Sequence, residues 1–269
     1  MAARSHSGPW RWIAVGACVA ICGAVLAGST TGSAAVGGAQ LLVLQLNLCN
    51  SGIAHCYTGH SVARAAAVIR GVGPNLVTLN EVCREDVSHL EQVLAEGARD
   101  GDVVSAFQPA GNRRTAAAFQ CRNRQSYGIG LLARFASLKD GYSIHAGIYP
   151  TQDTSDPEER AWLCLDTSDL VACATHLAST KPNVALAQCR YLFDTAIPAL
   201  PQRSRDKPTV LGADLNLKPH RIPDVRSCVP SGYVQTYDGG TQYIIGSRDL
   251  RVSSATTIGM NMTTDHPGL

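Results

Sequence analysis

The sequence predicts an α/β fold with a mixed sheet, and three observations lead to this prediction. Short apolar runs typical of buried strands alternate with segments whose apolar residues recur at helical spacing. Helices placed between buried strands are typical of layered α/β domains. The short turn "DTSD" joins two strand-like runs, 160–165 and 170–177, and so indicates a hairpin. A hairpin makes the sheet mixed rather than purely parallel.

The elements follow one another without a linker or repeat after residue 40, which favours one domain over residues 39–269. The predicted helix at 61–73 has Ser61 as its expected N-cap and Gly71 and Gly73 as stop signals, and Asn183 is the expected cap of the last helix. Residues 108–126 are polar and rich in arginine, and are expected to form a loop. Strands are predicted at 40–48, 75–82, 127–134, 160–165, 170–177, 208–214 and 241–247, and helices at 61–73, 86–100 and 182–197.

The first 38 residues differ from the rest. Arg4 and Arg11 precede the apolar run "WIAVGACVAICGAVLAG", and small residues follow it. This order is typical of a secretory signal peptide, with cleavage expected after Ala35. An uncleaved membrane anchor is the alternative, although the run is short for a spanning helix, which needs about 20 residues. We therefore expect a secreted protein without stable membrane contact, or an anchored one if the segment is retained.

Secretion changes how the cysteines are interpreted. Ten are present, and eight of them follow the apolar N-terminal segment. An even number in an exported domain favours disulfides, whereas a zinc site is the alternative, weakened because no C-x-x-C pair occurs. Cys49 and Cys56 would close a short loop, and Cys164 and Cys173 could face each other across the hairpin. The pairs Cys83–Cys121 and Cys189–Cys228 follow only by elimination, among about 105 connectivities.

The charge balance excludes one class of function. Without Arg4 and Arg11, 21 basic residues face 21 acidic ones. A neutral domain lacks the basic field of a dedicated nucleic-acid binder. It remains compatible with an enzyme that meets phosphate only at its active site.

Polar residues of one chemical type follow five of the predicted strands. Carboxylates, carboxamides and histidines without thiolate pairs suit a hard cation such as Mg²⁺ together with a phosphate. Sites in open α/β sheets gather where strands leave the core. Asp214 and Asn216 are two residues apart at one strand end, so in an extended chain both side chains would face one phosphate. The strand-end residues are Asn47, Glu81, His176, Asp214, Asn216, Asp265 and His266.

These residues lie in motifs that resemble the endonuclease/exonuclease/phosphatase superfamily, which includes deoxyribonuclease I. The motifs "LQLNL", "PNLVTLNEV", "YGIGLLAR", "ATHL", "GADLNLKP" and "TDHPGL" occur in the family's order over residues 41–269. The resemblance implies a four-layer sandwich of two mixed β-sheets flanked by helices.

The resemblance also implies a role for each residue. Glu81 and Asp265 would hold the metal, which would be Mg²⁺ or Mn²⁺, with Ca²⁺ as an alternative structural ion. Asp214 would orient or deprotonate the attacking water, while His176 and His266 would act on the scissile phosphate. The expected substrate-binding residues are Asn47, Asn216 and Tyr127.

Three departures from the family pattern matter. Gln242 stands where relatives have an Asp that bonds the final histidine, and a glutamine brings no charge to that partnership. Cys49 replaces an acidic residue of some relatives, which leaves one principal metal site. The chain ends soon after His266, so the last strand is expected to be short or absent.

The resulting functional hypothesis is a secreted, monomeric, Mg²⁺-dependent phosphodiesterase, with DNA as the favoured substrate. A phospholipid or small phosphate-ester hydrolase is the alternative enzyme. A non-catalytic binding or effector module that keeps the fold is the alternative from another class, supported by Gln242.

Overall fold

The computed structural model describes residues 40–96, 102–201, 204 and 206–269, and the predicted signal or anchor segment lies outside them. Residues 40–269 group into one unit with two principal sheets. The four-stranded sheet has the order β1-β2-β6-β3, in which only β1 and β2 are parallel. Its strands are β1 (Val43–Asn47), β2 (Leu76–Cys83), β6 (Tyr127–Phe135) and β3 (Asp102–Pro109).

The six-stranded sheet has the order β12-β13-β11-β10-β9-β7, in which only β10 and β11 are parallel. Its strands are β7 (Ser143–Ile148), β9 (Ala161–Asp166), β10 (Val171–His176), β11 (Thr209–Asp214), β12 (Val234–Tyr237) and β13 (Gln242–Gly246). A third, small sheet contains β4 (Gly111–Asn112), β5 (Ala117–Ala118) and β8 (Glu158–Glu159).

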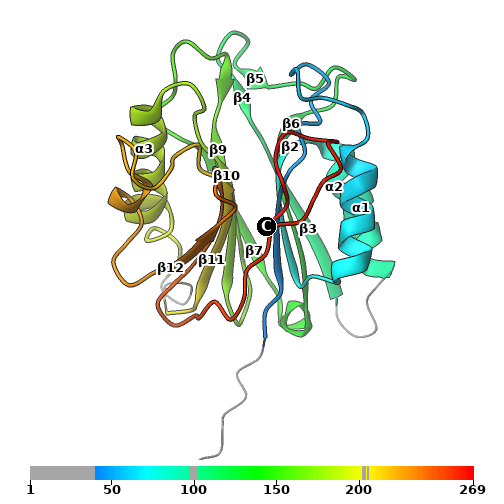
Figure 1. Cartoon of the computed structure of the whole chain (residues 1–269). Helices are drawn as coiled ribbons and strands as arrows, with labels where there is room; N and C mark the ends of the chain where they lie inside the picture. Colours follow the sequence, from blue (N-terminus) through cyan, green and yellow to red (C-terminus); the bar gives the residue numbers. More distant parts are fainter. Residues whose placement is uncertain (1–39, 97–101, 202–203, 205) are drawn as a thin grey trace, which may run out of the picture. The chain divides into compact units, whose positions relative to one another are not determined.

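Helices cover the outer faces of the two principal sheets (Figure 1). Helices α1 (Ser61–Val72) and α2 (Arg84–Glu96) pack on the four-stranded sheet. Helix α3 (Pro182–Tyr191) and a π-helical turn (Leu192–Ala196) pack on the six-stranded sheet. The inner faces of both sheets share an apolar cluster that includes Leu76, Leu131, Leu163 and Val210. Two short 3₁₀ helices, Ala136–Asp140 and Val225–Ser227, complete the elements.

The alternation of side chains along the strands explains why the layer between the sheets becomes polar near the strand ends. Along β2, Val77 and Leu79 pack in the helix-side cluster, whereas Leu76 packs between the sheets. Along β11, Leu211 and Ala213 belong to the α3-side cluster and Val210 to the inter-sheet cluster. Since successive residues face opposite sides of a sheet, alternate residues nearer the strand ends continue the inner layer. There they are polar, and this positions the site.

The α/β prediction with mixed sheets is confirmed, as are the seven predicted strands, within one to three residues at their ends. Strands β3, β7, β8 and β12 were missed, and the expected loop at 108–126 was wrong in part because it contains the end of β3 together with β4 and β5. Helix α1 has His60 rather than Ser61 at its N-cap position, and α3 has Lys181 rather than Asn183, but neither side chain makes a capping hydrogen bond. Gly73 ends α1 in a left-handed conformation, as its stop signal predicts.

The disulfides follow the expected pairing: Cys49–Cys56, Cys83–Cys121, Cys164–Cys173 and Cys189–Cys228. Cys164 and Cys173 are directly opposite each other in the β9–β10 pair. The last described residues form an isolated bridge, Ile258 to Gly268, and Leu269 exchanges backbone hydrogen bonds with Gln45. No helix among the described residues is long and apolar enough to cross a membrane.

Candidate active site

The amide of Asn47, at the end of β1, lies at the centre of the candidate site. Its Nδ2 donates to Glu81 Oε1 at 2.9 Å and to Asp214 Oδ2 at 3.1 Å. Its Oδ1 accepts from the backbone N–H of Cys49 at 3.1 Å, which fixes the orientation of the amide. One side chain therefore joins the two carboxylates that the sequence singled out, although they are far apart along the chain.

Glu81 reaches this site because β2 contains a bulge. The register with β6 shifts between Leu79 and Val82, and Glu81 has φ 56°. In regular alternation Glu81 would face the helices, as Val77 and Leu79 do. The extra residue and the left-handed backbone turn the carboxylate towards Asn47 instead. A left-handed glutamate costs about 1 kcal/mol, so the surrounding contacts must hold it in place.

The carboxyl of Glu81 is also electrostatically perturbed. Burial raises its pKa, and the Asp214 and Asp265 carboxylates add to the rise, whereas the Asn47 hydrogen bond and Arg160 oppose it. Three carboxylates close enough to influence one another are a set that a divalent cation would neutralise.

His266 and Asp265 come from the C-terminal segment and join the same site. His266 Nε2 lies 3.5 Å from Asp214 Oδ2 and 3.8 Å from Asp265 Oδ1. Thr264 ties the segment to β1 by donating to the carbonyl of Asn47 at 3.0 Å. Asp265 is more than half exposed, whereas Asp214 is 1% exposed. The segment thus presents a histidine above a buried carboxylate.

His176, at the end of β10, is directly beside Asp214 in the parallel pairing of β10 with β11. Its Nε2 lies 3.9 Å from Glu81 Oε1, and its Nδ1 lies 2.7 Å from Nη1 of Arg160. Burial lowers the pKa of His176 well below its usual range, and Arg160 and His266 lower it further. An arginine can only donate, so Nδ1 accepts and the ring proton resides on Nε2, towards Glu81.

Arg160 was missed by the sequence analysis and is the buried cation of the site. It also lies 3.3 Å from Glu158 and 3.6 Å from Asp156, and its side chain is only 5% exposed. Burial raises the pKa of Glu158 to about 7, with Arg160 opposing the rise. Tyr127 is buried beside this group, where burial and Glu158 raise the pKa of its hydroxyl. The structure therefore places Tyr127 with Glu158 and Arg160, behind Glu81.

Asn216 lies near Asp214, but not in the way the strand argument expects. Strand β11 ends at Asp214, and Asn216 has φ 50°. Its backbone N–H donates to Asp214 Oδ1 at 3.1 Å, and its Nδ2 donates to the carbonyl of Leu177 at 2.9 Å. The i, i+2 argument was wrong because an Asx turn replaces extended backbone after Asp214. Leu215 is fully buried, as that argument required.

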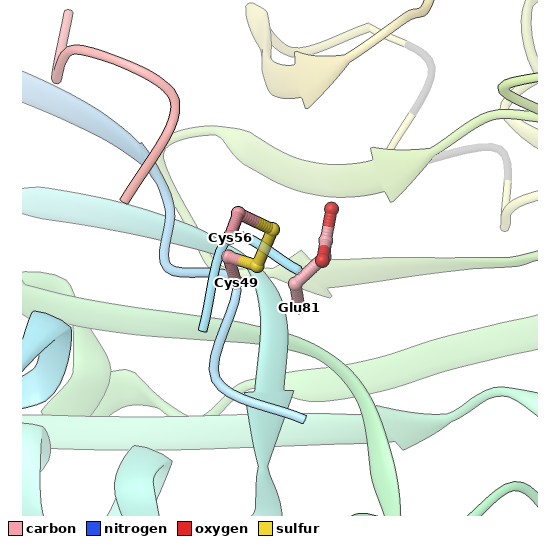
Figure 2. Close-up of side chains that lie close together, drawn as sticks. All are labelled: Cys49, Cys56 and Glu81. Atoms are coloured by element: carbon pink, nitrogen blue, oxygen red, sulfur yellow. A yellow bond between two sulfur atoms is a disulfide. The ribbon is translucent and has the colours of Figure 1, made fainter. Parts of the chain in front are cut away.

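The residues can hold a hard cation but not a thiolate-bound one. Figure 2 shows the Cys49–Cys56 disulfide beside the carboxylate of Glu81, and potential ligand atoms of these three residues lie within 4.8 Å of one another. Both sulfurs are bonded to each other, so neither is available as a thiolate. The carboxylate oxygens of Glu81 and Asp265 remain as candidate ligands, and oxygen donors of this kind suit a hard divalent cation.

Similar solved structures share this architecture. A Beutenbergia cavernae endonuclease/exonuclease/phosphatase is 18% identical, with TM-score 0.62 over 85% of this chain and 69% of that chain. Human Nocturnin catalytic domain with bound sulfate is 14% identical, with TM-score 0.55 over 77% and 82%. D. rerio TDP2 complexed with a single-strand DNA product is 14% identical, with TM-score 0.54 over 85% and 96%. No family model and no curated protein match the sequence.

The chain has the endonuclease/exonuclease/phosphatase fold. In this chain Asn47, Glu81, His176 and Asp214 lie near the carboxyl ends of two parallel strand pairs, β1 with β2 and β10 with β11. Asp265 and His266 come from the C-terminal segment. At identities below 20%, the likeness concerns the arrangement of the backbone.

Proposed function

We propose that the protein is an exported, divalent-metal-dependent hydrolase of phosphoester bonds, with DNA as the favoured substrate. The observation that carries the proposal is the convergence of Asn47, Glu81, Asp214 and His266 from separate segments. A structural role alone does not account for a left-handed glutamate and a buried aspartate facing one amide, with a partly exposed histidine 3.5 Å from the aspartate.

In this proposal Asp214 orients the attacking water and accepts its proton. Its carboxylate is held on one side by Asn47 and on the other by the N–H of Asn216. His266 faces the same carboxylate and has a side chain that is 24% exposed, so a phosphate oxygen can reach it. Its ring N–H would donate to the phosphoryl group as charge builds there.

Glu81 and Asp265 would hold the metal, and Mn²⁺ or Mg²⁺ bound there would neutralise developing negative charge on the phosphoryl oxygens. Asn47 keeps the Glu81 carboxylate aimed towards Asp214.

His176 has a different role from His266. With Nδ1 occupied by Arg160, it offers only the Nε2–H donor. It would therefore act as a neutral hydrogen-bond donor rather than as a base. Arg160 adds a permanent positive charge behind Glu81 and His176.

A nucleic acid is the favoured substrate on two grounds. The motif set resembles extracellular members with two histidines, and both histidines lie at this site. A structure of TDP2 with the same fold holds a single-strand DNA product, and one of Nocturnin holds a sulfate. Export is supported by four disulfides, since such bonds persist in oxidising compartments.

The test uses protein purified from an oxidising secretory host. Plasmid DNA, RNA, sphingomyelin and phosphoinositides are each incubated with it in Mg²⁺ or in EDTA. We expect EDTA-sensitive cleavage of DNA that His266→Ala abolishes and His89→Ala, an exposed histidine on α2, leaves intact. Cleavage of lipid alone would reject DNA as the substrate and support the alternative of a phospholipid hydrolase. Binding without turnover of any substrate would favour the non-catalytic module and reject the enzyme.

A further inference from the structure

A continuous line of buried polar side chains runs between the two sheets and ends on Asp214. Thr78 donates to Gln45 Oε1, and Gln45 Nε2 donates to Gln242 Oε1 at 3.0 Å. Gln242 Nε2 then donates to Asp214 Oδ2 at 2.5 Å. None of these four side chains is more than 1% exposed. The line joins β2, β1, β13 and β11, which come from both sheets.

Asp214, at the end of this line, determines which group donates and which accepts in each hydrogen bond of the line. An ionised Asp214 can only accept, so Gln242 must present its NH₂ group to it. The carbonyl of Gln242 then faces Gln45 and accepts from its NH₂ group. The carbonyl of Gln45 is left for the hydroxyl of Thr78, which must donate. Reversing one amide would set two donors or two acceptors against each other in a buried layer.

The backbone is shaped to admit this line. Gly212 lies opposite it, and a Cβ there would be 1.9 Å from Thr78 Oγ1 and 3.0 Å from Gln45 Oε1. Asn80 adds a second tie, since its Oδ1 accepts from Gln45 Nε2 at 2.7 Å and from the backbone N–H of Asp214 at 2.8 Å. The backbone of Asp214 is thus held by Asn80 and its side chain by Gln242, and both of these residues bond Gln45.

We infer that Gln242, supported by Gln45, is a positioning residue for Asp214. It stands where relatives have an aspartate that bonds the final histidine, and in this chain it bonds Asp214 instead. Gln242 uses both ends of its amide within the layer, on Gln45 and Asp214. His266 instead has Asp214 and Asp265 as its nearest carboxylates, at 3.5 and 3.8 Å. Asp214 therefore serves both the attacking water and His266. An acidic residue at 242 would face Asp214 as a second buried carboxylate, whereas the neutral amide donates a hydrogen bond to it.

The inference rests on the proposed function for its catalytic part only. Its structural part predicts a coupling between residues 242 and 214 that can be measured without a substrate. Gln242→Glu replaces the donor by a carboxylate at the same position and is expected to lower Tm by several degrees. In a double-mutant cycle with Asp214→Asn, which removes the facing charge but sets a second donor against the Asn47 amide, the two Tm losses should be clearly less than additive. If Gln242→Glu leaves Tm unchanged, or the two losses simply add, the positioning contact is rejected.

The kinetic part uses the substrate that the wild-type protein cleaves. Gln242→Met removes the donor without adding charge and is expected to lower kcat about 10-fold while KM stays within about 3-fold. Ser247→Ala is the matched control: this buried hydroxyl accepts from the backbone N–H of Thr209 at 3.0 Å, at the opposite end of β11 from Asp214. It should cost stability but keep kcat. Equal kcat losses in both variants, or none at Gln242→Met, would overturn the positioning role. An inactive wild type combined with intact 242–214 coupling would instead reject the proposed function alone.

Discussion

Arg160 Nη1 lies 2.7 Å from Nδ1 of His176, and this contact between a buried cation and a buried histidine sets the proton position of the ring. The guanidinium reaches Glu158 and Asp156 at the same time, so its planar fork links a histidine of the site to a pair of acids behind it. Lysine has the same charge but no fork and no rigid plane.

Arg160→Lys should therefore impair activity more than stability. The ammonium can hold Glu158 but cannot also keep the geometry at His176, so we expect kcat/KM to fall by about 10- to 100-fold. Arg160→Met should be worse for folding, since it leaves Glu158 without its cation, at a cost of about 3–5 kcal/mol. Steady-state kinetics and urea denaturation separate the two effects. Wild-type kcat/KM in Arg160→Lys would refute the tautomer argument.

Glu158 makes stability depend on pH. Its pKa is about 7 in the folded protein against 4.5 in the unfolded chain, so the folded state binds more protons between these values. Stability should fall as pH rises from 4.5 to 7, by up to about 3 kcal/mol for this group. Glu158→Gln resembles the protonated form and should match the wild type near pH 4.5 but exceed it near pH 8. Parallel pH curves for the two proteins would contradict this.

The Cys49–Cys56 disulfide should matter for activity beyond its effect on stability. It closes a separation of 7 residues, and Cys164–Cys173 closes 9, so loop entropy assigns each about 2.5 kcal/mol. Only the first lies beside Glu81, and the N–H of Cys49 holds Asn47. The double serine variant at 49 and 56 should lose most activity at a temperature where it is folded. The same change at 164 and 173 is the control and should retain kcat.

A glycine is needed at 212 because a larger residue would collide with the buried side chains of Thr78 and Gln45, and not because of its backbone conformation. A Cβ there would lie 1.9 Å from Thr78 Oγ1 and 2.8 Å from Thr78 Cβ. We expect Gly212→Ala to destabilise the protein by about 3 kcal/mol through overpacking, with partial recovery when Thr78→Ala is added. Gly71→Ala on α1 meets nothing within 4 Å and should be neutral or stabilising by about 0.5–1 kcal/mol. Thermal and urea unfolding of the three variants decide the matter.

Sequence alone predicts those site residues that lie where the apolar runs of the strands end. Apolar runs stop at Asn47, His176 and Asp214, and parallel pairing brings such ends together. The bulge that redirects Glu81 has no sequence signal, because it depends on the register with β6. Gln45 and Gln242 are 197 residues apart, and neither neighbourhood marks them as partners. Arg160 sits among acids, where local sequence cannot distinguish a buried cation from a solvated one.

Metal binding should depend on Glu81 and on its ionisation. Burial and two nearby carboxylates raise the pKa of Glu81, so protons compete with the metal at the low end of the pH range. Mn²⁺ affinity, measured by calorimetry, should rise with pH until Glu81 is ionised and then level off, with protons released on binding below that point. Glu81→Gln should weaken Mn²⁺ binding at least about 10-fold and remove this pH dependence. Glu96→Gln, at an exposed ion pair on α2, is the matched control. Equal Mn²⁺ affinity in both variants would mean that the Glu81 carboxylate does not bind the cation.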